Sequence, residues 1–301
     1  MSVFVDRSSR VIIQGFTGQH ATFHAAEAMA GGTNVVGGVT PGKGGSTHLD
    51  RPVFNSVAEA VAETGADVSG IFAPPQVAVD ALLEAIEAGI RVAVIIADGV
   101  PVQDMVRTKR YLTGRSTVII GPNSPGIITP GECKVGIMPS HIYRKGRIGV
   151  VSKSGTLNYE AVAQMGKLGL GQSTCVGIGG DPVNGVDFRT VMQAFEEDDE
   201  TDIVVLIGEI GGNQEVEAAR WASHYMNKPV VGFVAGASAP RGRRMGHAGA
   251  VISGESDTAT AKLDAMEALG LYTVRNPADI GDAVLRAIKE TGEHHHARAG
   301  P

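Results

Sequence analysis

Along nearly its whole length, the chain alternates short runs of β-branched residues with longer stretches that repeat apolar residues every three or four positions. The stretch 77–89 is the clearest of the second kind, because Val79, Leu82, Leu83 and Ile86 fall on one face of a helix. The short runs are apolar at consecutive positions, which is typical of parallel strands covered on both faces. The pattern predicts an α/β fold with helices on both sides of parallel sheets.

A stretch rich in proline and glycine at 121–131, and a less regular segment that follows it to Arg147, interrupt this alternation once. We therefore predict a doubly wound, Rossmann-like domain over residues 1–123, a connecting segment over 124–147 and a flavodoxin-like domain over 148–292. Residues 293–301, which include three consecutive histidines, are expected to form a disordered tail.

The expected elements of the first domain are strands at 11–14, 34–37, 69–72, 92–97 and 118–121, and helices at 23–31, 57–64 and 77–89. Those of the second are strands at 148–152, 173–176, 203–207, 230–234, 250–252 and 272–274, and helices at 156–168, 188–196, 213–226, 259–269 and 277–289.

The composition argues against several classes of protein. Hydrophobic residues make up 43% of the 301 residues and charged residues 19%, as in ordinary globular proteins. The formal net charge is −6 without a long basic run, so we expect no nucleic-acid partner. No apolar run is long enough to cross a bilayer, and two cysteines do not build a disulfide framework. These features predict a soluble, cytoplasmic protein.

The 41 glycines gather in clusters, and the first cluster follows a predicted strand. Gly15, Thr17 and Gly18 lie between the strand 11–14 and a helix, where a nucleotide phosphate meets a helix N-terminus. After the next strand, where an NAD site has an acid, Lys43 stands among glycines. This loop favours coenzyme A or NADP, each of which carries an additional phosphate, over NAD.

Three further loops at predicted strand ends carry polar groups. Ser154 is a suitable helix N-cap, and the N–H groups near Gly155 and Thr156 would face an anion. Glu209 is a single carboxylate among glycines, and His247 lies between glycines behind three arginines. An accessible imidazole and a carboxylate from another strand end form the pattern of an activated nucleophile or a proton shuttle.

Together these segments resemble the α subunit of succinyl-CoA synthetase, a succinate–CoA ligase. The likeness runs in chain order from about Val11 to Leu269, and the sequence GHAG at 246–249 is highly specific for this family. The segments are 15–18 (GFTG), 37–45 (GGVTPGKGG), 121–123 (GPN), 152–156 (SKSGT), 177–181 (GIGGD), 208–212 (GEIGG) and 246–250 (GHAGA).

The resemblance implies an NDP-forming acid–thiol ligase in which His247 is phosphorylated and Glu209 is its carboxylate partner. It implies that Ser154, Gly155 and Thr156 hold the phosphate and that Tyr159 contacts the substrate. The residues implied to bind coenzyme A are Thr17, Gly18, Gln19, His20, Lys43, Ile96, Ala97 and Asp98.

The resemblance also implies a partner, a β subunit of the ATP-grasp fold that binds ATP or GTP with Mg²⁺ in an αβ or α2β2 assembly. This chain has no G-x-x-x-x-G-K-[ST] loop of its own, which agrees with a nucleotide site on the partner. No metal site is expected in this chain.

Two alternatives remain open at this point. Asn158 stands where the family usually has Thr, and stretches at 103–112 and 136–143 look more like malate–CoA ligase (malate thiokinase), which would form malyl-CoA by the same mechanism. If Asn158 faces the substrate, its amide would pair with the 2-hydroxyl of malate. The more distant alternative is a Rossmann protein that binds NADP through Lys43 and needs no partner subunit.

Overall fold

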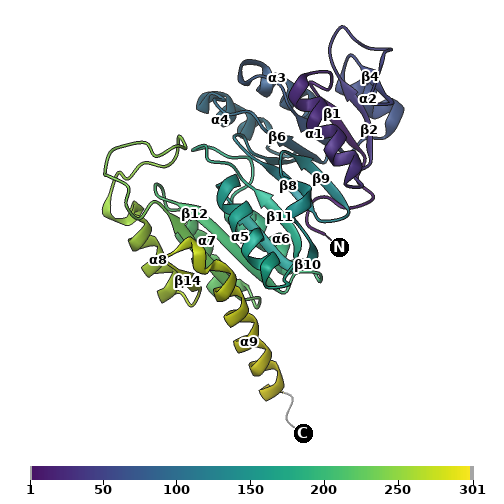
Figure 1. Ribbon diagram of the computed structural model, residues 1–301. Helices are drawn as coiled ribbons and strands as arrows, with labels where there is room; N and C mark the ends of the chain where they lie inside the picture. Colours follow the sequence, from purple (N-terminus) through teal and green to yellow (C-terminus); the bar gives the residue numbers. More distant parts are fainter. Residues whose placement is uncertain (1, 299–301) are drawn as a thin grey trace. The chain divides into compact units, whose positions relative to one another are not determined.

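The computed structural model describes residues 2–298, with side chains from Ser2 to Gly292. The chain forms two compact units (Figure 1). The first unit comprises residues 2–141 and 176–186, and the second comprises residues 142–175 and 187 onward.

The sheet of the first unit has the strand order of a Rossmann fold. Its order is β3-β4-β2-β1-β5-β6-β7, in which β3 is a short antiparallel edge strand. The other six strands follow one another as 3-2-1-4-5-6 along the chain, with parallel pairing throughout. The strands are β1 Val11–Gln14, β2 Val35–Val39, β3 Thr47–His48, β4 Arg51–Phe54, β5 Val68–Ile71, β6 Val92–Ile95 and β7 Val118–Ile120.

Helices of the first unit pack on this sheet through apolar faces. They are α1 Gln19–Ala30, α2 Val57–Thr64, α3 Pro75–Glu87 and α4 Val102–Tyr111. Leu82 and Ile86 of α3 belong to one core cluster with Ile12 and Ile95 of the sheet. All four residues of β6 are fully buried, as expected for a parallel strand covered on both faces.

The second unit has the strand order of a flavodoxin-like fold. Neighbouring strands follow the order β14-β13-β12-β10-β11, which is 5-4-3-1-2 along the chain. The strands are β10 Lys145–Ser152, β11 Gln172–Gly177, β12 Ile203–Glu209, β13 Val230–Ala235 and β14 Tyr272–Val274. The helices are α5 Gly155–Lys167, α6 Phe188–Glu197, α7 Gln214–Tyr225, α8 Ala259–Ala268 and α9 Ile280–Arg298.

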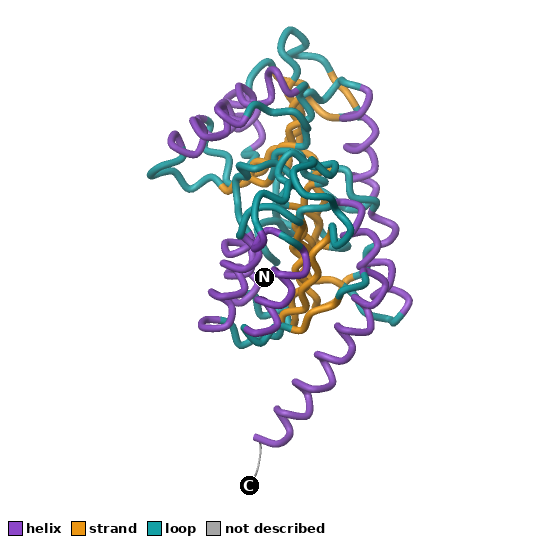
Figure 2. The backbone as a smooth tube through the Cα atoms, turned by 90° about the vertical axis from the view of Figure 1, so that its left-hand side faces the viewer, coloured by secondary structure: helices purple, strands orange, loops and turns teal. Residues whose placement is uncertain are grey.

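Viewed along its sheet, each unit has strands in the middle and helices on either side (Figure 2). The predicted α/β fold, Rossmann-like and then flavodoxin-like, is confirmed. In both strand orders the direction of winding reverses once, between β1 and β5 in the first unit and between β10 and β12 in the second. Ligands of open α/β sheets bind outside the carboxyl ends of the strands at such a switch point.

One predicted strand is wrong. Residues 250–252 form no strand and belong to the long loop between β13 and α8. Their backbone groups are paired inside that loop, since the N–H of Ala250 donates to the carbonyl of His247 and the carbonyl of Ile252 accepts from Gly242. Ala250 and Ile252 are nevertheless buried, which explains the apolar pattern.

Other elements were not expected. The first helix begins at Gln19 and not at Phe23, so the glycine loop before it is shorter than predicted. Helix α4 and the β3–β4 pair went unpredicted. The segment after 123 contains an antiparallel pair, β8 Gly126–Thr129 and β9 Cys133–Gly136, and the 3₁₀ turn η1 Ser140–Ile142. Two further 3₁₀ turns are η2 Glu255–Asp257 and η3 Pro277–Asp279.

The last helix continues into the predicted tail. Helix α9 extends to Arg298, and residues 299–301 lie outside the described part of the chain. Among the described helices, none is both long and apolar enough to cross a membrane.

Candidate active site

The predicted coenzyme A residues lie at the carboxyl ends of strands in the first unit. Thr17 and Gly18 follow β1, and Gln19 and His20 form the first turn of α1. Gly18 is the N-cap of α1, and it makes no side-chain capping hydrogen bond to this helix N-terminus. Such an end binds anions through its backbone N–H groups and the helix dipole.

Lys43 lies in direct contact with this loop. Its exposed ammonium donates to Thr17 Oγ1 at 3.0 Å. The backbone N–H groups of Gly42 and Gly44, on either side of Lys43, both donate to Asn55 Oδ1, at 2.9 and 3.0 Å. The structure therefore brings Lys43 to the start of α1, where a phosphate would meet a helix end and an ammonium together.

The third predicted group follows β6. Ile96 and Ala97 are half-buried and Asp98 is exposed. The N–H of Ile96 donates to the carbonyl of Ile71 at 3.2 Å, which ties this segment to the end of β5. Because β1, β5 and β6 are parallel, all three groups lie at the same edge of the sheet.

In the second unit, the predicted phosphate loop opens helix α5. Ser154 Oγ accepts from the N–H of Leu157 at 3.2 Å, which is the expected N-cap. Ser152 fixes the preceding turn, since its Oγ accepts from the N–H of Ser154 and donates to the Ser154 carbonyl. Gly155 and Thr156 form the first turn, and Thr156 is exposed.

Tyr159 and Asn158 lie one turn further along α5. Tyr159 is half-buried, and burial raises the pKa of its phenol. Asn158 is fully buried, and its Oδ1 accepts from the hydroxyl of Tyr143 at 2.9 Å. The hypothesis that Asn158 contacts a substrate hydroxyl is not favoured by this structure, because the whole side chain is buried.

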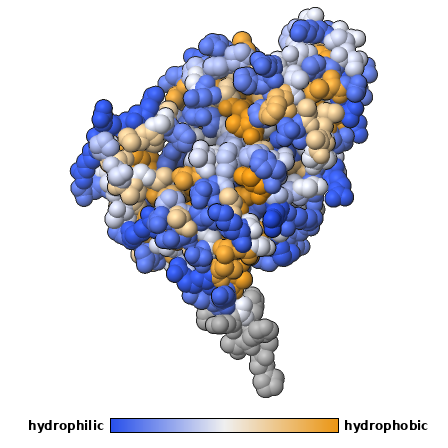
Figure 3. Space-filling model, viewed as in Figure 1, coloured by the Kyte–Doolittle hydropathy of each residue, from blue (hydrophilic) through white to orange (hydrophobic). Residues whose placement is uncertain are grey.

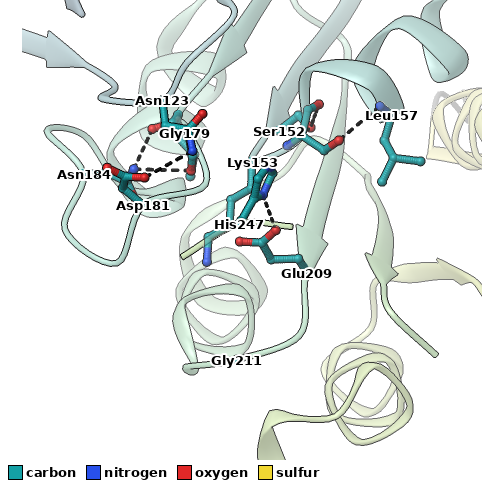
Figure 4. Close-up of polar contacts among 12 residues, drawn as sticks. Asn123, Ser152, Lys153, Leu157, Gly179, Asp181, Asn184, Glu209, Gly211 and His247 are labelled. Carbon is teal, nitrogen blue, oxygen red and sulfur yellow. Dashed lines mark hydrogen bonds and ion pairs between the residues drawn. The ribbon is translucent and has the colours of Figure 1, made fainter. Parts of the chain in front are cut away.

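Glu209 and His247 form a direct pair (Figure 4). Glu209 is the last residue of β12, and its Oε2 lies 2.6 Å from His247 Nδ1. The Glu209 side chain is 8% exposed and the His247 side chain 29%. The other carboxylate oxygen, Oε1, is buried and has no hydrogen-bond partner among the described residues. The pair lies beside the switch point between β10 and β12, where the fold predicts a ligand site.

The loop that carries His247 is held by a close backbone approach. Gly211 has φ +90°, and a Cβ there would overlap the carbonyl oxygen of Gly249. The N–H of Gly211 also donates to the carbonyl of Asp257 at 3.0 Å, near the end of the loop. The glycines around Glu209 and His247 thus let two backbone segments meet so that the side chains reach each other.

Three charged residues near this pair were not predicted from the sequence. Lys153, Glu215 and Lys262 are all buried, and ion pairs join Glu215 to both lysines. Burial alone would raise the pKa of Glu215, but the charges of Lys153 and Lys262 outweigh it and hold that pKa below its ordinary value. Burial lowers the pKa of Lys262, against the attraction of Glu215.

Solved structures share this fold. ATP citrate lyase of Methanosaeta concilii, in complex with (3S)-citryl-CoA, matches 96% of this chain with a TM-score of 0.85 and 26% identity. This chain spans about half of that protein, 51% of its length. A dinucleotide-forming acetyl-coenzyme A synthetase of Ca. Korarchaeum cryptofilum matches 92% of the chain with a TM-score of 0.71 and 16% identity, which indicates the fold alone.

Sequence comparisons are more specific. Residues 6–99 match the CoA binding domain family and residues 151–271 match the CoA-ligase family. The succinate–CoA ligase [ADP-forming] subunit alpha of Staphylococcus aureus is 54% identical over 292 residues, which is 97% of either chain. The protein of the same name from Staphylococcus epidermidis is 52% identical over the same share. With this identity over nearly the whole length, the chain belongs to the family of succinate–CoA ligase α subunits.

Proposed function

We propose that this chain is the α subunit of an ADP-forming succinate–CoA ligase, which reversibly converts succinate, CoA and ATP into succinyl-CoA, ADP and phosphate. The family and both domain matches support the proposal. The single observation that carries the chemistry is the 2.6 Å contact between His247 Nδ1 and Glu209 Oε2. That contact fixes the tautomer in which Nδ1 carries the proton and Nε2 is the nucleophile.

In the first step, the lone pair of His247 Nε2 attacks the γ-phosphorus of ATP held by the partner subunit. A nitrogen–phosphorus bond forms, the bond from phosphorus to the bridging oxygen breaks, and ADP leaves with that electron pair. Nδ1 keeps its proton, so the ring gains positive charge. The Glu209 carboxylate lies at the atom where it stabilises this charge.

In the second step, a carboxylate oxygen of succinate attacks the phosphorus, and the electrons of the nitrogen–phosphorus bond return to Nε2. The product is succinyl phosphate. The thiol sulfur of CoA then attacks the acyl carbon, the carbon–oxygen bond to phosphate breaks, and the thiol proton is passed to phosphate or solvent. No net charge stays on the ring of His247 after the cycle.

Binding roles follow from the positions described above. Ser154, Gly155 and Thr156 would hold the transferred phosphoryl group at the N-terminus of α5, and Tyr159 would contact the acid. The coenzyme would be bound at the carboxyl edge of the first sheet, with Lys43 on one of its phosphates. The residues proposed to bind it are Thr17, Gly18, Gln19, His20, Lys43, Ile96, Ala97 and Asp98.

A β subunit is part of the proposal, because this chain has no phosphate-binding loop for ATP. We propose that it has an ATP-grasp fold, holds the nucleotide with Mg²⁺, and forms αβ or α2β2 assemblies. Met245, two residues before His247, is 46% exposed, which suits a loop that meets another protein. Other exposed apolar groups are small and scattered among hydrophilic residues on the face shown in Figure 3.

We keep the domain boundaries 1–123, 124–147 and 148–292, with a tail over 293–301, as a proposal. A cytoplasmic location is also proposed, and the two free, buried cysteines, Cys133 and Cys175, support it.

Malate as the substrate is not favoured, because the relatives are named for succinate and Asn158 is buried. The match to the CoA binding domain favours CoA over NADP.

Intact-mass analysis tests the proposal. Incubation with the β subunit and ATP should add one phosphoryl group that is lost in acid and retained in alkali. His247→Ala should lack the addition and the ligase turnover. Ligase turnover of His247→Ala at the wild-type rate would overturn the assignment.

A further inference from the structure

Three buried charged residues form a cluster, two of them bind the backbone of Glu209, and none takes part in the chemistry above. Lys153 follows β10, Glu215 lies in the first turn of α7, and Lys262 lies in α8. Glu215 and Lys262 are completely inaccessible to solvent, and Lys153 is 7% exposed. Lysine is rarely buried unless it is paired, so a fully buried lysine in this place needs an explanation.

Two of the hydrogen bonds of the Lys262 ammonium go to the backbone at the end of β12 and the turn that follows it, and a third goes to Glu215 in α7. The ammonium donates to the carbonyl of Glu209 at 2.8 Å, to the carbonyl of Gly211 at 2.7 Å and to Glu215 Oε2 at 2.6 Å. An ammonium has three donors, and here all three are used. Lys262 thus fixes the backbone on both sides of Ile210.

Glu215 binds the backbone N–H of Glu209, whose carbonyl is bound by Lys262. Its Oε1 accepts from the N–H of Glu209 at 3.2 Å and lies 3.3 Å from the ammonium of Lys153. A Cβ on Gly208 would overlap the Glu215 side chain, so the glycine before Glu209 makes room for it. The N–H and the carbonyl of Glu209 are therefore both bound by this charged group.

Buried ion pairs are an inefficient way to stabilise a fold, because desolvation offsets much of the attraction. In this case the ion pairs lie against the backbone of Glu209, whose carboxylate contacts His247. We propose that Lys262 and Glu215 are positioning residues for phosphoryl transfer: they hold the Glu209 backbone so that its carboxylate stays on Nδ1 of His247. This inference rests on the proposed function, since it concerns the phosphorylation of His247.

The charge of the group supports the same role. Two ammonium groups face one carboxylate, so the group has a net charge of +1 next to the carboxylate of Glu209. Lys153 also directly precedes Ser154, and its N–H donates to the carbonyl of Ile207 in β12 at 3.1 Å. Lys153 thereby links the phosphate loop to β12 and, through Glu215, to the backbone of Glu209.

A double-mutant cycle tests the inference. The rate of His247 phosphorylation by ATP is measured in the assembled complex with the β subunit, for wild type, Lys262→Met, Glu209→Gln and the double variant. A shift of an ångström in a reacting group costs on the order of 10²-fold in rate, and we expect a loss of about this size in Lys262→Met. Because Lys262 acts through Glu209, the double variant should be little slower than Glu209→Gln alone.

Met266→Ala is the matched control. Met266 is a fully buried residue of the same helix, and its side chain packs against Gly232 of β13. It should lower the melting temperature while the phosphorylation rate stays near that of wild type. If Lys262→Met does not yield a folded complex, Glu215→Gln replaces it in the same cycle.

The outcomes separate the two proposals. A wild-type complex that gains no phosphoryl group on His247 overturns the proposed function. A phosphorylated wild type with an unchanged rate in folded Lys262→Met, or with fully additive losses in the cycle, overturns the positioning role alone. A large loss that disappears in the Glu209→Gln background supports it.

Discussion

Gly211 packs so closely against the carbonyl oxygen of Gly249 that a Cβ on residue 211 would overlap that oxygen. We therefore expect Gly211→Ala to displace the loop that carries His247. The φ of +90° adds about 1–3 kcal/mol of backbone strain to the overlap. Differential scanning calorimetry should show reduced stability, and the rate of His247 phosphorylation should fall by about tenfold or more.

Gly212→Ala is the control for that experiment. Gly212 also has a positive φ, +59°, but no atom in the described part of the chain lies within 4 Å of a Cβ there. Its substitution should cost about 1–2 kcal/mol of stability with little effect on the phosphorylation rate. Equal rate losses in both variants would show that the contact with Gly249 is unimportant.

Glu209→Gln should slow phosphorylation of His247 on the order of 10²-fold, as is typical when one preorganised electrostatic contact is lost. The amide is nearly isosteric and can still accept from Nδ1, but it has no charge to stabilise the ring as phosphate arrives. Rapid-quench measurement of phosphoenzyme formation gives the rate. CoA affinity, measured by calorimetry, serves as the internal control and should not change.

Lys43→Ala should raise the KM for CoA about tenfold to a hundredfold and leave phosphorylation of His247 intact. The reason is that a hydrogen bond to a charged group contributes about 1.5–3 kcal/mol, and 1.4 kcal/mol corresponds to a factor of ten. Arg110→Ala removes one positive charge from an exposed position of the same unit and should behave as wild type. Thermal protection by NADP and not by CoA would contradict this assignment.

Glu215→Gln should show a stability loss that depends on pH. The pKa of Glu215 is lowered in the folded chain, so its contribution is present above its ordinary value of 4.5 and is lost as pH falls through the lower folded value. Breaking a buried ion pair typically costs about 3–5 kcal/mol, and this is the difference expected at pH 7. Urea titrations at pH 7 and at successively lower pH should show the difference between variant and wild type shrinking.

Much of the fold follows from local patterns. Consecutive apolar residues, as at 92–95, marked parallel strands because both faces of such strands are buried. The local pattern indicated only an imidazole and a carboxylate in glycine-rich loops, and the resemblance to the family implied that Glu209 and His247 are partners. Neither inference depended on long-range packing.

The features that the sequence did not predict depend on tertiary packing. Residues 250–252 have a strand-like composition, but their hydrogen bonds are made inside the loop. Lys262 looks like a solvated helix residue in sequence, and only the fold places its ammonium against two backbone carbonyls. Asn158 was weighed as a substrate contact, yet a residue 15 positions away, Tyr143, occupies its oxygen.

Both ends of the His247 loop are bound by successive residues of one strand end. The N–H of Ile210 donates to the carbonyl of Ala235, where the loop begins, and the N–H of Gly211 donates to the carbonyl of Asp257, near its end. Both ends of the loop are therefore fixed at the end of the same strand. The shorter of the two connections from that point to His247 is the ten residues that follow His247. At about 3.5 Å per extended residue, these ten residues cannot place the backbone of His247 more than about 35 Å from the end of β12. If a phosphoryl donor lies farther from the end of β12 than this distance plus the length of the histidine side chain, His247 meets it only when whole domains move.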